Sequence, residues 1–349
     1  MINKICFTRE WINKVREGNP PADPTIVEKT IYAFELLSEL LIKRLDFVFK
    51  GGTSLLLLLK NPKRLSIDID ISTNENSKNV ESILDEIINS SVFTSWIEDN
   101  RKQTKIPKKH YKIFFNSTIN PMHNSYILLD VLFQKNLYPK TIRINLKNKF
   151  IALDENIKCT LPSVNSLVGD KLTAFAPHTT GIPFGVGKSM QIQKQLFDLG
   201  SLFTLISDID EVYQAFKIFV DIEAMYRDCS FTIDDVKNDI LSVSFLISQM
   251  QIRKGISNEE TKELYEGISK LRSHLIGINY NLETAKIFAS QIAFLVGTLD
   301  RKEIFEMYKE YSIDKISEKS LNENYRILER IKTVLPEAYY YWQILDKIL

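Results

Sequence analysis

The sequence is poor in the residues that define several classes of protein. Its 349 residues include only three cysteines, Cys6, Cys159 and Cys229, which are widely separated and odd in number. The sequence therefore argues against a disulfide framework and against a cysteine zinc site. Twelve glycines and eleven prolines are too few for a collagen-like or low-complexity chain. The longest apolar run of the first half, Leu55 to Leu59, is far shorter than the roughly 20 residues of a membrane span.

The remaining composition is that of a globular protein. Hydrophobic residues make up 44% of the chain and charged residues 26%. The length exceeds what one hydrophobic core usually serves, so we expect two domains. The first residues contain no apolar signal core, so we expect a cytoplasmic protein that has no membrane partner.

The charge is unevenly distributed along the chain. The formal net charge is only +1, but eleven lysines and arginines face a single acid, Asp130, between Arg101 and Lys149. Such a basic region is typical of phosphate-binding surfaces. A solvated, lysine-rich surface would have the same composition, and charge alone leaves both interpretations open.

The first half of the chain predicts an α+β fold. Apolar residues recur at helical spacing over residues 25–45, and a strict alternation over residues 65–72 predicts a strand. A short strand, a Gly-Gly turn and a helix starting at a hydroxyl cap are expected between them. The ranges are a strand at 46–50, helices at 53–60 and 80–89, and strands at 111–115, 126–133 and 141–146.

From residue 163 onward the sequence predicts helices alone. Their expected starts are polar capping residues, namely Ser163, Ser207, Thr232, Ser257 (with Glu260 in a capping box) and Asn281. The strand signal ends near residues 153–163. We therefore expect one domain at 1–160 and a helical domain at 161–349.

Three aspartates stand out as candidate metal ligands. Asp68 and Asp70 are two apart on a predicted strand, so their carboxylates project from the same face and repel each other unless a cation lies between them. Asp130 is flanked by three apolar residues on each side, which is typical of a strand buried on both faces. A buried carboxylate needs a compensating partner. Shared metal ions would compensate the charge of all three carboxylates. The alternatives are that the Asp68 and Asp70 pair forms a solvent-facing polar edge, and that Asp130 forms an ion pair with a lysine.

A glycine turn precedes the aspartate pair. Gly51 and Gly52 lead from a predicted strand into a predicted helix that starts at Thr53. Such a turn presents backbone N–H groups and the positive end of a helix dipole, which suit the terminal phosphates of a nucleotide.

These motifs together resemble a known family. Phe49-Lys-Gly-Gly-Thr-Ser-Leu55, Lys63-Arg-Leu-Ser-Ile-Asp-Ile-Asp-Ile-Ser72 and then Asp130 follow the pattern of DNA polymerase β-like nucleotidyltransferases, and more closely that of the AbiEii/AbiGii toxins of type IV toxin–antitoxin systems. The segment 166–174 is similar to the third family motif, built around Lys171. The segment 194–199 is similar to the fourth, built around Asp198, except that Gln195 stands where the family usually has an aspartate.

The resemblance implies an activity and a set of roles. It implies a mixed sheet with flanking helices, followed by a helical domain, and a transferase that uses Mg²⁺ or Mn²⁺ and an NTP. Asp68, Asp70 and Asp130 would hold the metal ions, and Lys171 and Asp198 would complete the catalytic set. The implied nucleotide-binding residues are Lys50, Gly51, Gly52, Thr53, Ser54, Arg64 and Ser66.

The acceptor implied by the resemblance is RNA, with tRNA preferred. A cognate antitoxin that represses its own operon would be the protein partner. We assign RNA binding to the basic residues of a segment expected to be an exposed connection, namely Arg101, Lys102, Lys105, Lys108, Lys109 and Lys112. The alternatives are a protein or small-molecule acceptor, and a nucleotide-binding module without catalysis.

Overall fold

The computed structural model describes residues 1–100 and 106–349, which form two compact units. The first, here the sheet unit, comprises Met1–Ser163 and Ser273–Ile278, and the second, here the helical unit, comprises Val164–Arg272 and Asn279–Leu349. The α+β class with a C-terminal helical part is confirmed. Among the described residues, no helix is both long and apolar enough to cross a membrane.

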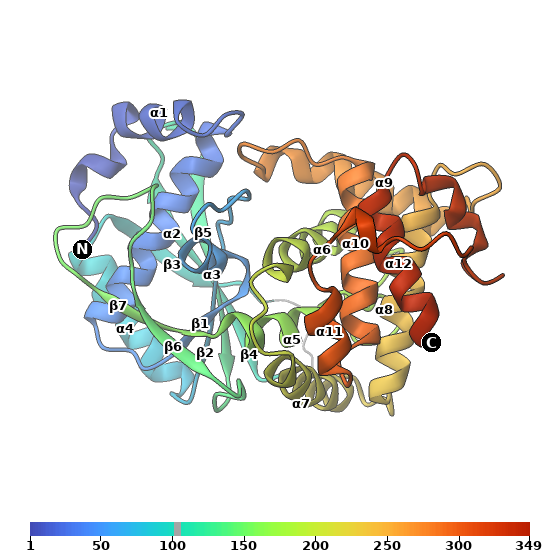
Figure 1. Ribbon diagram of the computed structural model, residues 1–349. Helices are drawn as coiled ribbons and strands as arrows, with labels where there is room; N and C mark the ends of the chain where they lie inside the picture. The colour runs from blue at the N-terminus through green and yellow to red at the C-terminus, as the bar shows by residue number, and fades with distance from the viewer. Residues whose placement is uncertain (101–105) are drawn as a thin grey trace. The chain divides into compact units, whose positions relative to one another are not determined.

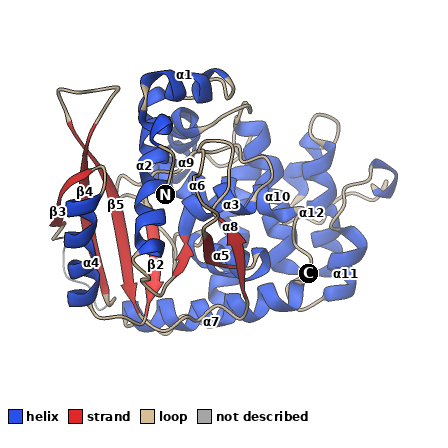
Figure 2. Ribbon diagram, turned by 90° about the vertical axis from the view of Figure 1, so that its left-hand side faces the viewer, coloured by secondary structure: helices blue, strands red, loops and turns tan. Residues whose placement is uncertain are grey.

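The sheet unit is built on a five-stranded mixed sheet with strand order β1-β2-β5-β4-β3 (Figure 2). The pair β2 and β5 runs parallel, whereas β1–β2, β4–β5 and β3–β4 run antiparallel. A separate two-stranded sheet joins β6 and β7. The strands are β1 (Val48–Lys50), β2 (Ile69–Thr73), β3 (Phe93–Glu98), β4 (Lys108–Asn116), β5 (Asn124–Phe133), β6 (Thr141–Asn145) and β7 (Lys158–Pro162).

Helices α2 and α4 pack their apolar residues against this sheet in one hydrophobic core. Helix α2 begins at a proline, and the Asp23 side chain accepts the N–H groups of Thr25 and Ile26, which caps its first turn. The helices of the unit are α1 (Arg9–Glu17), α2 (Pro24–Ile42), α3 (Gly51–Leu58) and α4 (Ser77–Ser90), and a 3-10 turn spans Lys4–Phe7.

Two expectations for the site region are wrong in detail. The strand expected at residues 65–72 starts only at Ile69. The helix that was expected to begin at a Thr53 cap begins at Gly51 instead. Its N-cap residue is Lys50, whose side chain makes no capping hydrogen bond. The Thr53 hydroxyl instead donates to the carbonyl of Asp68. The glycine pair is therefore the first turn of α3 itself.

A short stretch from late in the chain, Ser273–Ile278, belongs to the sheet unit, and we call it the return segment. The Leu65 N–H donates to the His274 carbonyl at 2.7 Å, and the Ile276 N–H donates to the Lys63 carbonyl at 2.9 Å. Ile276 is 1% exposed and lies in the core of the unit. The stretch before β2 is thus held by residues 200 positions away in sequence.

The helical unit contains the remaining α-helices around α10, which packs against α6, α8 and α12 (Figure 1). Thr232 and Asn281 cap their helices as expected. Asp208 replaces Ser207 as a cap, and Asn258 with Thr261 forms the box expected from Ser257 and Glu260. The helices are α5 (Val164–Ala174), α6 (Ser189–Phe203), α7 (Ile209–Arg227), α8 (Ile233–Gln249), α9 (Glu259–Leu271), α10 (Leu282–Gly297), α11 (Lys302–Tyr308) and α12 (Pro336–Ile348), and the 3-10 helices are η3 (Ile313–Lys315) and η4 (Arg326–Ile331). A further 3-10 helix, η2 (Arg272–His274), spans the boundary between the helical unit and the return segment.

Candidate active site

Two carboxylates lie side by side at the centre of the mixed sheet. Asp70 on β2 is the register partner of Asp130 on the parallel strand β5. The flanking residues Ile69 and Ile71 are fully buried, so their side chains occupy the face of β2 that packs against the core. The side chains of Asp70 and its register partner Asp130 therefore lie on the opposite face of the sheet. The sequence predicted that the strand of Asp130 lies beside the strand of the aspartate pair. The register confirms this neighbourhood for Asp70.

Asp70 has an environment that disfavours its charged form. The pKa of its carboxyl group is raised from 3.8 to about 6, mainly by burial and in addition by the nearby carboxylates of Asp130 and Asp68, against the opposing effects of Lys108 and Lys50. Burial is therefore the main reason why its charged form is disfavoured.

Asp130 is buried but compensated. Its Oδ2 atom lies 2.8 Å from the Lys108 Nζ atom, and its Oδ1 atom accepts a hydrogen bond of 2.6 Å from Nδ1 of His110. Burial raises the pKa of Asp130, but Lys108 and then His110 outweigh it and hold the pKa below 3.8. The lysine ion pair that the sequence left open as an alternative is present.

The glycine turn packs directly against Asp70. Gly51 has φ = +73°, and a Cβ atom placed on it would lie 2.2 Å from Oδ2 of Asp70. A Cβ on Gly52 would lie 2.5 Å from Nη2 of Arg64 and 3.0 Å from Oγ of Ser66. The positive φ of Gly51 therefore favours glycine, whereas a side chain at Gly52 would have to displace the Arg64 guanidinium. The two motifs form one site.

The two hydroxyls after the glycines serve the turn itself. Thr53 donates to the Asp68 carbonyl, and Ser54 Oγ donates to the Gly51 carbonyl at 2.7 Å. Both residues are fully buried. The first backbone N–H groups of α3 lack intrahelical acceptors, as in any helix, and they are the groups suited to phosphate.

The carboxylates fit a divalent cation by chemistry. Within the described residues, no three or more His, Cys, Asp or Glu side chains are arranged to hold a metal ion. However, Asp68, Asp70 and Asp130 are hard oxygen donors, and a cation beside Asp70 would offset the burial that disfavours its charged form. Asp130 would have to exchange Lys108 for the ion.

The third and fourth sequence motifs meet inside the helical unit. Lys171 on α5 forms a buried ion pair with Asp198 on α6, with 2.8 Å between Nζ and Oδ2. The Lys171 Nζ atom also lies 3.4 Å from Oε1 of Gln195, the residue that departs from the family pattern. Lys171 and Asp198 therefore satisfy each other's charge.

The basic segment is not an exposed connection throughout. Arg101, Lys102 and Lys105 lie outside the described residues. Lys108, Lys109 and Lys112 lie on β4, so the expectation of an exposed connection is wrong for these three. Each has a carboxylate partner, which leaves less of its charge for a ligand. The pairs are Lys108 with Asp130, Lys109 with Glu81 and Glu98, and Lys112 with Asp99.

Sequence reasoning missed His110 as a member of the site. It is the register partner of Asp130 on β4, and Lys108 precedes it by two residues on the same strand. Side chains two apart share a face of a strand. The Lys-Lys-His run, followed by alternating apolar residues, therefore already indicated that Lys108 and His110 lie on the same face.

Comparison with known families supports the same class of protein. A family model described as the nucleotidyl transferase AbiEii toxin of a type IV toxin–antitoxin system matches residues 35–269, about two thirds of the chain. No curated protein matches the sequence significantly.

Several solved structures are similar to this chain at low sequence identity, and one of them supports a shared fold. MenT4, a nucleotidyltransferase toxin from Mycobacterium tuberculosis H37Rv, is 13% identical, with a TM-score of 0.52 over 96% of this chain and 99% of that chain. JHP933 from Helicobacter pylori is 11% identical, with a TM-score of 0.41 over 88% and 97%. An antigenic nucleotidyltransferase-like protein from Paracoccidioides brasiliensis is 12% identical, with a TM-score of 0.38 over 60% and 92%.

Proposed function

The chain belongs to the AbiEii family of nucleotidyltransferase toxins of type IV toxin–antitoxin systems, and from this membership we propose that it transfers a nucleotide from an NTP to an RNA hydroxyl, with tRNA as the preferred acceptor. The observation that supports this most directly is the register of Asp70 and Asp130 beside the glycine turn of α3. An antitoxin partner follows from the family.

The glycine turn would bind the β- and γ-phosphates of the NTP. The close packing of Gly51 on Asp70 and of Gly52 on Arg64 brings the backbone, a carboxylate and a guanidinium into one place. The N-terminus of α3 supplies N–H donors and a positive dipole end. Lys50, whose register partner is Asp70, would add charge on the same side.

Asp68 and Asp70, joined by Asp130, would hold Mg²⁺ or Mn²⁺. When bound, such an ion would neutralise charge on the α-phosphate and on the leaving pyrophosphate. Asp130, which its low pKa keeps ionised, would accept a hydrogen bond from the attacking hydroxyl and orient it. His110, donating from Nδ1, would hold the orientation of that carboxylate. A new oxygen–phosphorus bond then forms as the bond to pyrophosphate breaks.

Exposed cations near β6 are the better surface for an RNA acceptor. Three of the six residues first assigned to RNA are paired on β4, whereas the later basic residues of the region are all exposed. RNA affinity that depends on such residues falls with salt, with a log–log slope of roughly 0.7 per phosphate contact for a single strand. These later residues are Lys135, Lys140, Arg143, Lys147 and Lys149.

The test of the reaction is transfer from each labelled NTP to total RNA in Mg²⁺. Asp70→Asn and Asp130→Asn should each lower transfer about 100-fold or more, since each removes a carboxylate that would hold the metal ion. Asp154→Asn, at an exposed carboxylate of the same unit, should leave transfer unchanged. Normal transfer by the Asp70 variant would refute the site. Transfer by wild type to protein but not to RNA would refute the acceptor, and RNA binding without any transfer would favour a binding module.

The test of the acceptor surface is RNA binding at several salt concentrations. Replacing Arg143, Lys147 and Lys149 by Gln should weaken binding and flatten the salt dependence. Replacing Lys4, Lys14 and Arg16, three exposed cations on other elements of the unit, is the matched control. Equal effects of the two triple variants would argue against a specific surface near β6.

A further inference from the structure

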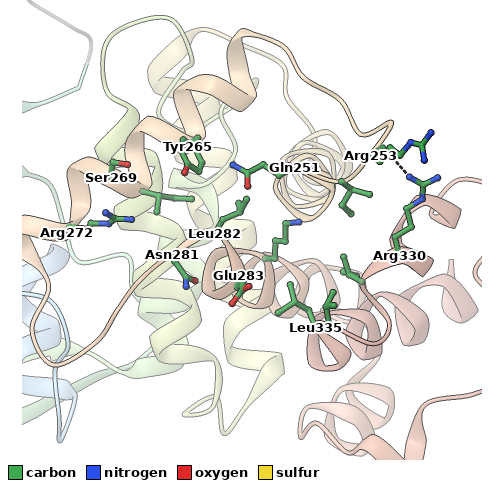
Figure 3. Close-up of a pocket in the computed structure, with 15 residues that line it drawn as sticks. Gln251, Arg253, Tyr265, Ser269, Arg272, Asn281, Leu282, Glu283, Arg330 and Leu335 are labelled. Carbon is green, nitrogen blue, oxygen red and sulfur yellow. Dashed lines mark hydrogen bonds between the residues drawn. The ribbon is translucent and has the colours of Figure 1, made fainter.

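The helical unit contains a second pocket, remote in sequence from the aspartates and the glycine turn (Figure 3). It has a volume of about 540 Å³, within the range of small-molecule sites. Its walls come from the end of α8, from α9, from the start of α10 and from η4 with the residues that follow it. All of its residues belong to the helical unit, and those next to α8, Gln251 to Arg253, follow the end of that helix.

The lining of this pocket is strongly cationic. Four basic residues line it, Arg253, Arg272, Lys286 and Arg330, against one carboxylate, Glu283. Arg330 donates to the backbone carbonyl of Arg253, which fixes one side of the opening (Figure 3). Such an excess of positive charge attracts anions.

Lys286 is a buried cation without a hydrogen-bonded partner in the part of the chain that the structure describes. It is 6% exposed, and among the described residues no hydrogen bond or ion pair reaches its Nζ atom. Burial lowers the pKa of Lys286, against an opposing effect of Glu283. A buried lysine of this kind is costly unless an anion compensates it, so its place in the wall indicates a ligand.

The N-terminus of α10 opens into the same pocket. Asn281, Leu282 and Glu283, the cap and the first two residues of this 16-residue helix, all line it. The Asn281 side chain accepts the N–H of Thr284 at 3.0 Å, and the first N–H groups of the helix have no intrahelical acceptor. A phosphate at this position would meet both the helix dipole and Lys286.

An apolar and aromatic wall stands beside the charged groups. Tyr265 is 47% exposed, and Ile252, Ile268 and Leu335 line the pocket with it. A neighbouring hollow of about 270 Å³ shares Tyr265 and Ile252 with this pocket. A flat base can pack on a tyrosine ring, and a second base can follow into the next hollow.

We propose that this pocket binds a phosphorylated nucleoside, with the phosphate on Lys286 and the α10 N-terminus and the base against Tyr265. The ligand is either a free nucleotide or one nucleotide of an RNA strand, since both present the same chemistry. The site is separate from the NTP site proposed at Gly51 and does not depend on it.

The proposal is tested by calorimetry on the full-length protein with AMP, with the dinucleotide pApA and with inorganic phosphate. Lys286→Met should weaken AMP binding at least 10-fold, whereas Lys237→Met, which removes a lysine of α8 outside the pocket, should not. Tyr265→Ala, at an exposed position, should weaken AMP but leave phosphate unchanged. Tighter binding of pApA than of AMP would identify RNA as the source, and equal binding would identify a free nucleotide.

Photolabelling with 8-azido-AMP separates this site from the proposed NTP site. Peptide mapping should place the label on the α9 peptide that contains Tyr265. Label found only near Gly51, AMP binding that Lys286→Met leaves intact, or AMP binding no tighter than inorganic phosphate would each overturn the proposal. None of these results bears on transfer at Asp70 and Asp130, so the two proposals fail independently.

Discussion

The charge of Asp70 lowers the stability of the folded protein, whereas the proposed reaction requires that charge. Its pKa of about 6 lies above the ordinary value of 3.8, so the folded protein holds this proton more tightly than the unfolded chain does. Stability therefore falls as the pH rises from about 4 to about 6 and remains lower above that window. The loss comes mainly from burying the Asp70 carboxylate and, in addition, from keeping it next to Asp130 and Asp68.

Asp70→Asn should stabilise the protein while it abolishes transfer. The amide keeps the shape but removes the charge, so we expect Tm to rise by about 3 °C at pH 7.5 and to change little at pH 4. Thermal unfolding at the two pH values measures this. An unchanged Tm at pH 7.5 would mean that Asp70 is already compensated there.

The site was only partly predictable from its residues. The aspartates and glycines are informative because alternation and buried charge each limit what a strand or turn can do. His110 and Lys108 were not assigned to the site, since their contact with Asp130 depends on the β4–β5 register. Register is set by packing across the sheet, which a single sequence does not specify.

At the scale of elements, the segment between α5 and α6 is tied to two helices by one histidine. His178 Nδ1 lies 2.8 Å from Asp239 Oδ1 on α8, and Nε2 lies 2.8 Å from Glu260 Oε1 on α9. The His178 N–H and the Thr179 hydroxyl also donate to Asp239. Partial burial lowers the pKa of His178, but its bonds to Glu260 and Asp239 outweigh this effect and raise the pKa above 6.5.

This tie should weaken as the pH rises. Because the folded pKa of His178 is raised, its stabilisation is complete below about pH 6.5 and is lost as the pH passes through the folded value. Amide exchange near residues 177–188 should therefore quicken several-fold at alkaline pH beyond the intrinsic rate. In His178→Gln this extra pH dependence should vanish. Its persistence there would assign the effect to another group.

A buried ion pair joins α5 to α6. Lys171 and Asp198 have side chains that are 7% and 2% exposed, so neither charge can turn to water. Removing one partner leaves the other charge buried and unpaired, which costs about 3–5 kcal/mol. The pair therefore stabilises the helical unit whether or not Lys171 also meets phosphate.

Lys171→Met should destabilise the helical unit by about 3–5 kcal/mol, and adding Asp198→Asn should restore much of that loss. Denaturant unfolding of the single and double variants measures both effects. If the double variant regains stability but not transfer, the pair has a role in the reaction as well. If Lys171→Met alone unfolds normally, the pair contributes nothing to stability.

Prediction of the elements succeeded where a period was long and clear. Strands β4, β5 and β6 lie where their patterns indicated, with altered ends, and helices α5, α7, α8, α9 and α10 begin close to the expected capping residues. Strand β3 was missed because it is an edge strand beside β4, and most of its residues are at least partly exposed. Strand β7 was missed because it is short and ends in a proline, a residue that argues against a strand in a sequence pattern.

At the scale of the whole molecule, the sheet unit is discontinuous in sequence. Its core includes Ile276 from the return segment, which also bonds to the backbone at Lys63 and Leu65. Arg64, whose guanidinium lies against Gly52, forms a β-bridge with Leu275. The glycine turn therefore depends on residues that follow α9.

Ile276→Ala should destabilise the sheet unit by about 2–5 kcal/mol, as expected for a fully buried isoleucine. Ile278→Ala, at a less buried neighbour, should cost less. Amide exchange should show the loss of protection at Leu65 and in β2, rather than in α10. Loss confined to the helical unit would show that the return segment is not integral to the sheet.

The discontinuity also sets an order of events during synthesis. Domains begin to fold as they leave the ribosome, N-terminal parts first. Residues 1–163 emerge early. However, the stretch at Lys63 and Leu65, which leads to Asp68 and Asp70, lacks its hydrogen-bond partner, the return segment, until residue 278 has been made. By then all of α5 to α9 has been translated. A half-made chain would thus lack part of the phosphate site proposed at the glycine turn, and that site could be completed only after about four fifths of the chain has been made.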